Sequence, residues 1–152
     1  MPRRSPRAAV EEMPTELQEQ IALFKWAGLM LGRWPELQWL YHVSNEGKRS
    51  LILGSLMKRA GLKSGVPDLC LPVARYPYHG LYIEMKRRKG GRLTQNQSEW
   101  LEGLKQQGYK TMRCDGWEPA AQAILEYLKI KERWQTNDSE RISGAGAENG
   151  TT

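Results

Sequence analysis

The chain has 152 residues, of which 39% are hydrophobic and 26% are charged, and its formal net charge is +6. This length leaves room for one domain with a core of its own and excludes a second full domain. No apolar run approaches the ~18 residues of a bilayer-spanning helix, and the basic first residues do not lead into the apolar stretch of a secretory signal. We therefore expect a cytoplasmic protein outside the membrane, with a charge that favours polyanionic partners.

The two ends of the chain differ in composition from its middle. Residues 1–13 mix Pro, Arg and Ser without periodicity, and residues 135–152 are mostly small, polar and Gly-rich. Such segments bury too little apolar surface to offset the entropy that folding costs. We expect two disordered tails, the first of them basic, around one folded domain at residues 14–134.

The first half of this domain predicts a helix, a strand and a second helix. Thr15 and Gln18 form a capping-box pattern, which predicts a helix over 15–31. Apolar positions recur along it at helical spacing, at Leu17, Ile21, Phe24, Gly28 and Leu31. The segment 38–44 is aromatic and β-branched and predicts a strand, whereas residues 50–60 predict a helix that ends before Gly61.

The second half predicts two neighbouring strands, then a helix, a strand and a helix. Strand-like runs at 68–73 and 80–86 are joined by a Tyr-Pro turn. Thr94 and Gln97 repeat the capping-box pattern before a helix over 95–107. A strand over 109–114 and a helix over 119–131 follow, and the helix has Ala120, Ala123, Ile124 and Tyr127 to bury. The order α β α β β α β α predicts an α/β fold with a mixed central sheet flanked by helices.

Three charged residues stand at related positions on the two neighbouring strands. A hairpin centred on Tyr76 places Leu69 opposite Ile83 and leaves the odd positions on one apolar face. The same register places Asp68 opposite Glu84, and Lys86 emerges on the face of Glu84 one pleat along. A slip by one residue would scramble both faces, so the pattern supports this register.

Two acids and a lysine in one patch suit the hydrolysis of phosphodiesters. Opposed side chains in a sheet lie ~5 Å apart, close enough for two carboxylates to share a hard divalent cation. The cation relieves their repulsion and activates a water, and a lysine beside it can neutralise charge on a phosphoryl group. The alternative is structural: Glu84 and Lys86 form an exposed cross-strand pair, and Asp68 merely opens its strand.

Longer segments carry a resemblance to a known family. Three segments carry it: GVPDLCLPV, GLYIEMKRRKGGRLTQNQSEW and GYKTMRCDGWEPAAQAILEYL. They resemble the VRR-NUC branch of the PD-(D/E)XK nucleases, in the compact stand-alone form that is typical of bacteriophages and prophages. The similarity runs from about Thr15 to Leu128, and SNEGKR, GLKSGVPD and GGRLTQNQ follow in the family's order. The resemblance implies a restriction-endonuclease-like core and a metal-dependent, structure-specific DNA endonuclease.

The resemblance also implies roles for individual residues. Asp68 and Glu84 would be ligands of Mg²⁺ or Mn²⁺, Met85 would offer its backbone carbonyl, and Lys86 would be the catalytic lysine. Gln97 matches the family's glutamine on the following helix, although its place in the capping box could be its only task.

An acid on the first helix completes the metal's outer shell in this family. Glu16 matches that position, with Glu19, one turn along, as the alternative.

Basic residues surround this predicted site. We expect phosphate contacts from Arg49, Lys58, Lys63, Arg87, Arg88, Lys89 and Arg92. Phosphates carry no base code, so recognition would follow the shape of the DNA. Stand-alone members resemble Holliday-junction resolvases in being homodimers, which implies a dimer that cuts branched, four-way DNA.

Two other functions stay open at this point. One is a non-catalytic DNA-binding or recombination accessory protein, and the other is a nuclease acting on flapped or nicked DNA or on RNA. Isolated His42 and His79 argue against a structural zinc.

Overall fold

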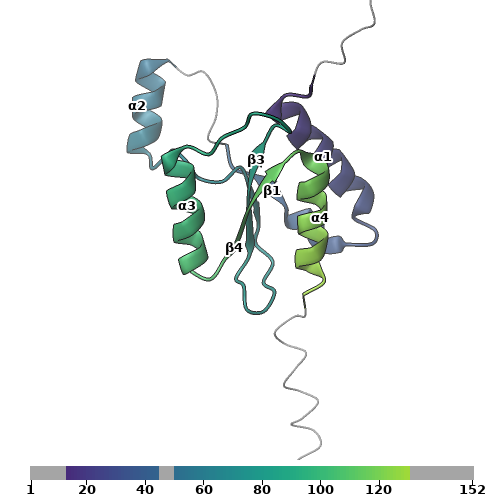
Figure 1. The fold of residues 1–152 in the computed structure, drawn as a ribbon. Coiled ribbons are helices and arrows are strands. Elements are labelled where there is room, and N and C mark those ends of the chain that lie inside the picture. The colour runs from purple at the N-terminus through teal and green to yellow at the C-terminus, as the bar shows by residue number, and fades with distance from the viewer. Residues whose placement is uncertain (1–12, 45–49, 131–152) are drawn as a thin grey trace, which may run out of the picture.

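The computed structural model describes residues 13–44 and 50–130 and contains one mixed four-stranded sheet (Figure 1). The elements in chain order are α1 (Glu16–Met30), the 3₁₀ helix η1 (Pro35–Trp39), β1 (Tyr41–His42), α2 (Leu51–Arg59), β2 (Leu69–Leu71), β3 (Leu81–Lys86), α3 (Gln95–Gln106), β4 (Lys110–Asp115) and α4 (Trp117–Leu128). This arrangement confirms the predicted α/β class. The predicted tails, apart from Met13, lie outside the described residues, as does Arg49.

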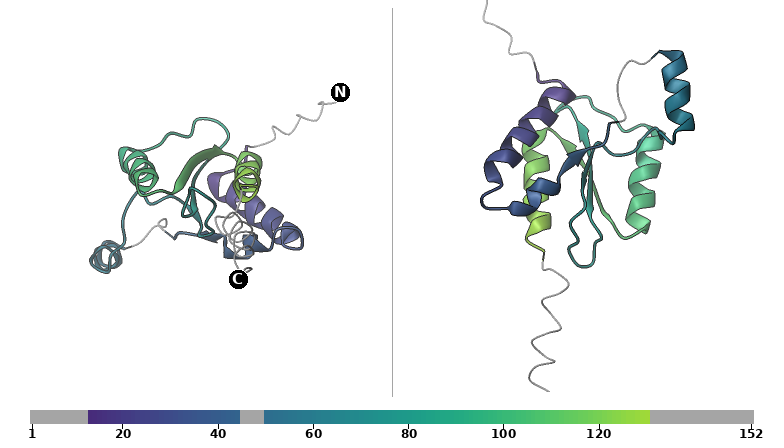
Figure 2. Two further views of the ribbon diagram at one scale, coloured as in Figure 1. Left: turned by 90° about the horizontal axis from the view of Figure 1, so that it is seen from below. Right: turned by 180° about the vertical axis from the view of Figure 1, so that it is seen from behind.

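The helices form layers on both faces of the sheet. Figures 1 and 2 show α1 and α4 side by side on one face and α3 on the other, with α2 standing apart beyond α3. None of the helices in the described residues is both long and apolar enough to span a bilayer.

The sheet has the order β1-β2-β3-β4. β2 pairs with β1 and β3 antiparallel, and β4 lies parallel to β3 after the crossover through α3. Leu69 lies opposite Ile83 and Leu71 opposite Leu81, as predicted. The register follows from the period-2 pattern, because it places the aliphatic side chains Leu69, Leu71, Leu81 and Ile83 on one face.

That apolar face forms the core with α1 and α4. Leu69, Ile83 and Met85 are at most 1% exposed and belong to the same cluster as Leu23 of α1 and Ile124 of α4. The opposite face of β3 carries Glu84, which contacts Gln97 of α3, and Lys86. The hairpin therefore separates a dry packing surface from a charged one.

The strand predicted over residues 38–44 is only partly present. Gln38 and Trp39 belong to η1, and pairing in β1 is limited to Tyr41 and His42. Pro35 favours a helical start because its fixed φ suits a first turn. The aromatic residues Trp39 and Tyr41 are 57% and 48% exposed, so they do not mark a longer buried strand.

The face that α1 buries also differs from the predicted stripe. Leu17 and Ile21 are 65% and 59% exposed, whereas Leu23 and Ala27 pack in the core together with Glu19. An acid within the buried stripe breaks the apolar periodicity. Leu17 and Ile21 recur at helical spacing too, but they lie on the solvent-facing side of α1, so the apolar pattern predicts the wrong buried face.

The last helix begins at Trp117, two residues before the predicted start at Pro119. Gly116 precedes it with a φ of +104°, a backbone conformation that side chains rarely adopt. The Trp117 N–H donates to the Glu19 side chain at 2.9 Å. The capping side chain belongs to α1 and is distant in the sequence, so the residues around Trp117 do not indicate a helix start there and the sequence predicts a later one.

Candidate active site

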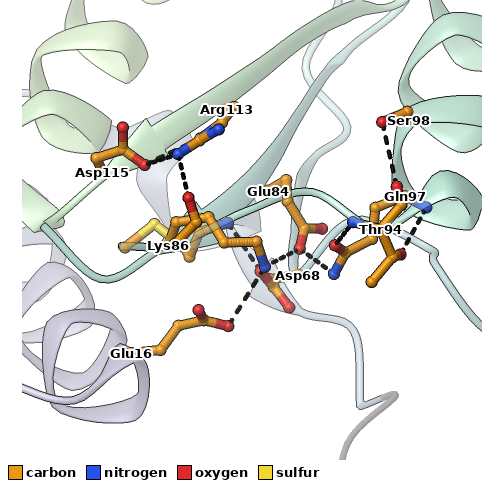
Figure 3. A network of polar contacts seen from close by, with 11 residues as sticks. Glu16, Asp68, Glu84, Lys86, Thr94, Gln97, Ser98, Arg113 and Asp115 are labelled. Carbon is orange, nitrogen blue, oxygen red and sulfur yellow. Dashed lines mark hydrogen bonds and ion pairs between the residues drawn. The ribbon is translucent and has the colours of Figure 1, made fainter. Parts of the chain in front are cut away.

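Asp68, Glu84 and Lys86 lie together at one end of the β2–β3 hairpin (Figure 3). All three are buried, and Glu84 is 0% exposed. The Lys86 Nζ donates to Glu84 Oε1 at 2.7 Å. Asp68 stands just before β2, and its Oδ2 accepts a hydrogen bond of 2.8 Å from the Met85 N–H. The predicted convergence is present, although Asp68 reaches across to β3 with its side chain and lies outside the strand ladder.

A close backbone contact holds the segment that leads to Asp68. Gly65 has a φ of +85°, and a Cβ there would lie 2.7 Å from the backbone of Asn96 in the first turn of α3. The Asn96 Nδ2 also donates to Ser64 Oγ at 2.9 Å. Glycine is needed here because both the φ and the space exclude a side chain. Asp68 is thereby tied to the helix that carries Gln97.

Gln97 uses its two amide atoms for different contacts. Its Oε1 accepts from the Thr94 N–H at 2.9 Å and completes the predicted capping box. Its Nε2 donates to Glu84 Oε1 at 2.5 Å. Helix capping is therefore not its only contact, and the structure brings it into the site.

The two acids of α1 point to different partners. Glu16 Oε1 lies 3.7 Å from Lys86 Nζ, at the edge of the site in Figure 3. Glu19 is 1% exposed and is bound by Arg88 and by the Trp117 N–H. Of the two alternatives that the sequence left open, Glu16 is the acid beside Lys86.

Burial and neighbouring charges shift the ionisation of the site. Burial raises the pKa of Glu84 to about 7; the hydrogen bond from Lys86 opposes this, and the charges of Asp68 and Glu16 add to it. Burial lowers the pKa of Lys86, but the hydrogen bond and charge of Glu84, with the charges of Glu16 and Asp68, outweigh it, so the net pKa is raised. Lys86 is therefore held as an ammonium.

The donor set suits a small hard cation. Glu84 Oε2 is buried and, among the described residues, has no hydrogen-bond partner. An oxygen in that state is costly unless a ligand satisfies it. The described residues contain no group of three or more His, Cys, Asp or Glu side chains placed to hold a metal. Asp68 and Glu84 with the Met85 carbonyl would instead resemble Mg²⁺ sites, which use one or two carboxylates and retain water.

The predicted basic residues separate into two groups. All six that the structure describes are exposed: Lys58, Lys63, Arg87, Arg88, Lys89 and Arg92. Arg88 differs, because its guanidinium is bound by Glu19 and Glu118 at 2.6 Å each. A pocket beside Glu16 is lined by Met13, Pro14, Thr15, Glu16, Arg87, Lys89 and Gly90.

One residue near the site was missed by the sequence reasoning. Arg113 of β4 is the register partner of Glu84, and its guanidinium binds Asp115 and the Gly91 carbonyl, the latter at 2.8 Å. A Cβ on Gly91 would lie 2.8 Å from the Lys86 Cβ. Arg113 thus holds the basic loop against Lys86. The sequence shows that polar and apolar residues alternate along this strand, but it does not show that β4 pairs with β3, which is what brings Arg113 opposite Glu84.

Comparison with known proteins agrees with this geometry. The profile of the VRR-NUC domain family matches residues 15–118, a range that runs from α1 to the start of α4. A solved structure described as a VRR_NUC domain protein is 28% identical, with a TM-score of 0.67, and the match covers 80% of this chain and 93% of that one. No curated protein matches the chain at a significant level. The family match covers most of the chain, and the fold and the charged patch agree with it, so the chain belongs to the VRR-NUC domain family, a family of PD-(D/E)XK nucleases.

Proposed function

We propose that this protein is an endonuclease that uses Mg²⁺ or Mn²⁺ to hydrolyse phosphodiester bonds in branched DNA. The observation that carries the proposal is the buried Glu84 carboxylate, with one unsatisfied oxygen, beside Asp68 and Lys86. Such an arrangement is costly for folding alone, whereas a cation would compensate it.

Asp68, Glu84 and the Met85 carbonyl would hold the metal. When bound, the ion would lower the pKa of a water and offset negative charge on the phosphate. The remaining roles fall to side chains. The Lys86 ammonium, kept charged by Glu84, would stabilise charge that develops on the phosphoryl oxygens. Gln97 would orient Glu84 by donating from Nε2 to the Glu84 Oε1, and Glu16 stands on the far side of Lys86.

The exposed basic residues would bind the DNA backbone. Arg87 and Lys89 line the pocket beside Glu16, so a phosphate held there would lie next to Glu16, which itself is 3.7 Å from Lys86 Nζ. Lys58, Lys63 and Arg92 would extend the contact along the duplex. None of these contacts reads bases, which supports recognition by shape. The four-way junction as substrate is proposed from the resemblance of stand-alone family members to junction resolvases.

A homodimer would suit a symmetric junction. α2 supports this assembly, because Leu51 and Ile52 are 94% and 77% exposed and the helix has no buried residue. Large apolar side chains on a short helix are costly in water and suit a protein partner. We place the activity in the cytoplasm of a bacterial host, and the phage or prophage origin stays a prediction.

The test is a cleavage assay on labelled linear, flapped and four-way DNAs in Mg²⁺ or Mn²⁺, with EDTA as control. We expect cleavage only with metal, fastest on the four-way DNA. Glu84→Gln should abolish cleavage but leave binding, whereas Glu126→Gln, on the exposed face of α4, should match the wild type. Cleavage that persists in EDTA or in Glu84→Gln would remove the proposal.

The same assay separates the alternatives. Binding of DNA without cleavage of any substrate would favour the accessory protein. Faster cleavage of a flapped DNA or of RNA than of the junction would keep the chemistry and change the substrate.

A further inference from the structure

Glu19 is a buried carboxylate that the proposed reaction does not use. It is 1% exposed and lies on α1 one turn after Glu16. Its carboxylate accepts from Arg88 Nε at 2.6 Å and from the Trp117 N–H at 2.9 Å. Glu19 thus joins three segments that are distant in the sequence: α1, the loop after β3 and the start of α4.

Arg88 lies two residues after Lys86, at the other end of this contact. Its Nη2 also donates to Glu118 of α4 at 2.6 Å. The backbone turns closely beneath the pair, since a Cβ on Gly116 would lie 3.2 Å from the Arg88 Cγ and 3.5 Å from Glu19 Oε2. The guanidinium is held from two sides, and both hydrogen bonds raise its pKa.

The neighbouring basic residues differ from Arg88 in their contacts with the described part of the chain. Among the residues that the structure describes, neither Arg87 nor Lys89 forms an ion pair with an acid. Both line the pocket beside Glu16. The basic run therefore contains two kinds of cation, which sequence alone cannot tell apart.

We infer that Glu19 and Arg88 form a positioning pair, which holds Glu16 and Lys86 at their mutual distance, and that Arg88 does not bind DNA phosphates. Glu16 lies one helical turn from Glu19, and Lys86 lies two residues from Arg88. The bridge therefore anchors both sides of the 3.7 Å contact between Glu16 and Lys86. The inference about positioning rests on the proposed function. The inference about phosphate contact does not.

The first test measures DNA binding against salt, in EDTA, on a linear duplex. Each phosphate contact contributes about 1 to the slope of log K against log salt concentration. We expect Arg87→Met to lower the slope by about 1 and Arg88→Met to leave it unchanged. The two variants remove the same charge from adjacent positions, so net charge is matched. An equal fall of the slope in both would overturn the inference.

The second test measures kcat, KM and the half-saturating Mn²⁺ concentration. Residues that orient a metal's surroundings typically contribute 10- to 100-fold to affinity or activity, so we expect losses of about that size in kcat for Glu19→Gln and Arg88→Met, with KM for DNA nearly unchanged. The double variant should lose no more than either single one, because both remove one contact. Losses that multiply, or an unchanged kcat, would refute positioning.

Two further variants guard against a general folding defect. Glu118→Gln removes an exposed partner of the same guanidinium and should stay within about twofold of the wild type in kcat, since Glu19 still holds Arg88. Arg88→Lys keeps the charge but cannot reproduce the contact of two nitrogens, Nε and Nη2, with the Glu19 carboxylate, so it should fold and show a lowered kcat if Arg88→Met unfolds. A fully active Arg88→Lys would refute positioning. If the wild type cleaves nothing, the proposed function fails, while the salt comparison still decides whether Arg88 binds phosphate.

Discussion

Gln97 combines two tasks on two atoms of one amide. The oxygen caps α3, and the nitrogen binds Glu84. The capping box could be predicted from the spacing of Thr94 and Gln97, because it is a local contact. The second contact needs β3 and α3 to be packed together, and no local pattern contains it.

Gln97→Glu separates these tasks. A carboxylate at this position still accepts from the Thr94 N–H and keeps the cap, so any fall in the free energy of unfolding reports repulsion from Glu84 and should shrink below pH 7, where Glu84 binds a proton. It cannot donate to Glu84, and cleavage should fall about 10- to 100-fold. Thermal unfolding and initial cleavage rates check both expectations. Thr94→Ala, which removes the capping side chain, should lower the free energy of unfolding and leave the cleavage rate nearly unchanged. A Gln97→Glu variant with wild-type cleavage would exclude a role of Gln97 in the site.

The Glu84 carboxyl predicts how metal-free stability depends on pH. Its pKa is about 7 in the folded protein, whereas the ordinary pKa of a glutamate is 4.5, so the folded state binds more protons between these values. The free energy of unfolding should therefore decrease as pH rises from about 4.5 to about 7, by on the order of 3 kcal/mol.

The measurement is urea unfolding in EDTA at several pH values, with Glu84→Gln as the reference. Glu84→Gln lacks the titrating group, so its unfolding free energy should change less across this window. Lys86 does not contribute there, because its raised pKa places its titration at alkaline pH. Parallel pH curves for the two proteins would show that Glu84 ionises normally.

At the scale of elements, local signals were the reliable ones. Both capping boxes, the hairpin register and the end of α2 before Gly61 agree with the structure. The buried face of α1 and the length of β1 do not, because tertiary neighbours decide them. The segment that leads to Asp68 could be predicted in part: the sequence contains Gly65, but only the structure shows that this glycine packs against the backbone of α3.

Gly65→Ala tests that contact. The added methyl group would overlap the backbone of Asn96 and force a left-handed φ on alanine. We expect a loss of about 1–3 kcal/mol in the free energy of unfolding, together with slower cleavage as Asp68 shifts. Gly54→Ala is the matched control, because nothing lies within 4 Å of its added Cβ. In a helix it should be neutral or stabilising by up to about 1 kcal/mol. Equal effects of the two substitutions would contradict the close contact.

At the scale of the whole molecule, α2 buries none of its side chains against the rest of the described residues. Its large apolar side chains face outward, whereas those of α1 and α4 include the core residues Leu23 and Ile124. An exposed apolar surface of this kind is unfavourable in a monomer, because water contacts it, and is covered when it forms an interface between two subunits.

Leu51→Glu should therefore turn the proposed homodimer into a monomer. Within the chain the side chain is 94% exposed, so the fold of each subunit should survive. Light scattering after gel filtration gives the mass, and circular dichroism checks the fold. Leu23→Ala provides the opposite control, with a loss of about 2–5 kcal/mol from a core cavity and no specific effect on assembly. A wild type that is monomeric at every concentration would end the homodimer proposal.

The sequence by itself determined what depends on short spacings. The alternation along two strands placed Asp68, Glu84 and Lys86 in one patch, and the capping boxes marked where two helices begin. Only the tertiary structure decided which acid of α1 faces Lys86, that Arg88 pairs with Glu19, and that Arg113 lies beside Glu84. These contacts join segments far apart in the chain, and their partners depend on how helices and strands pack, which no spacing within one element encodes.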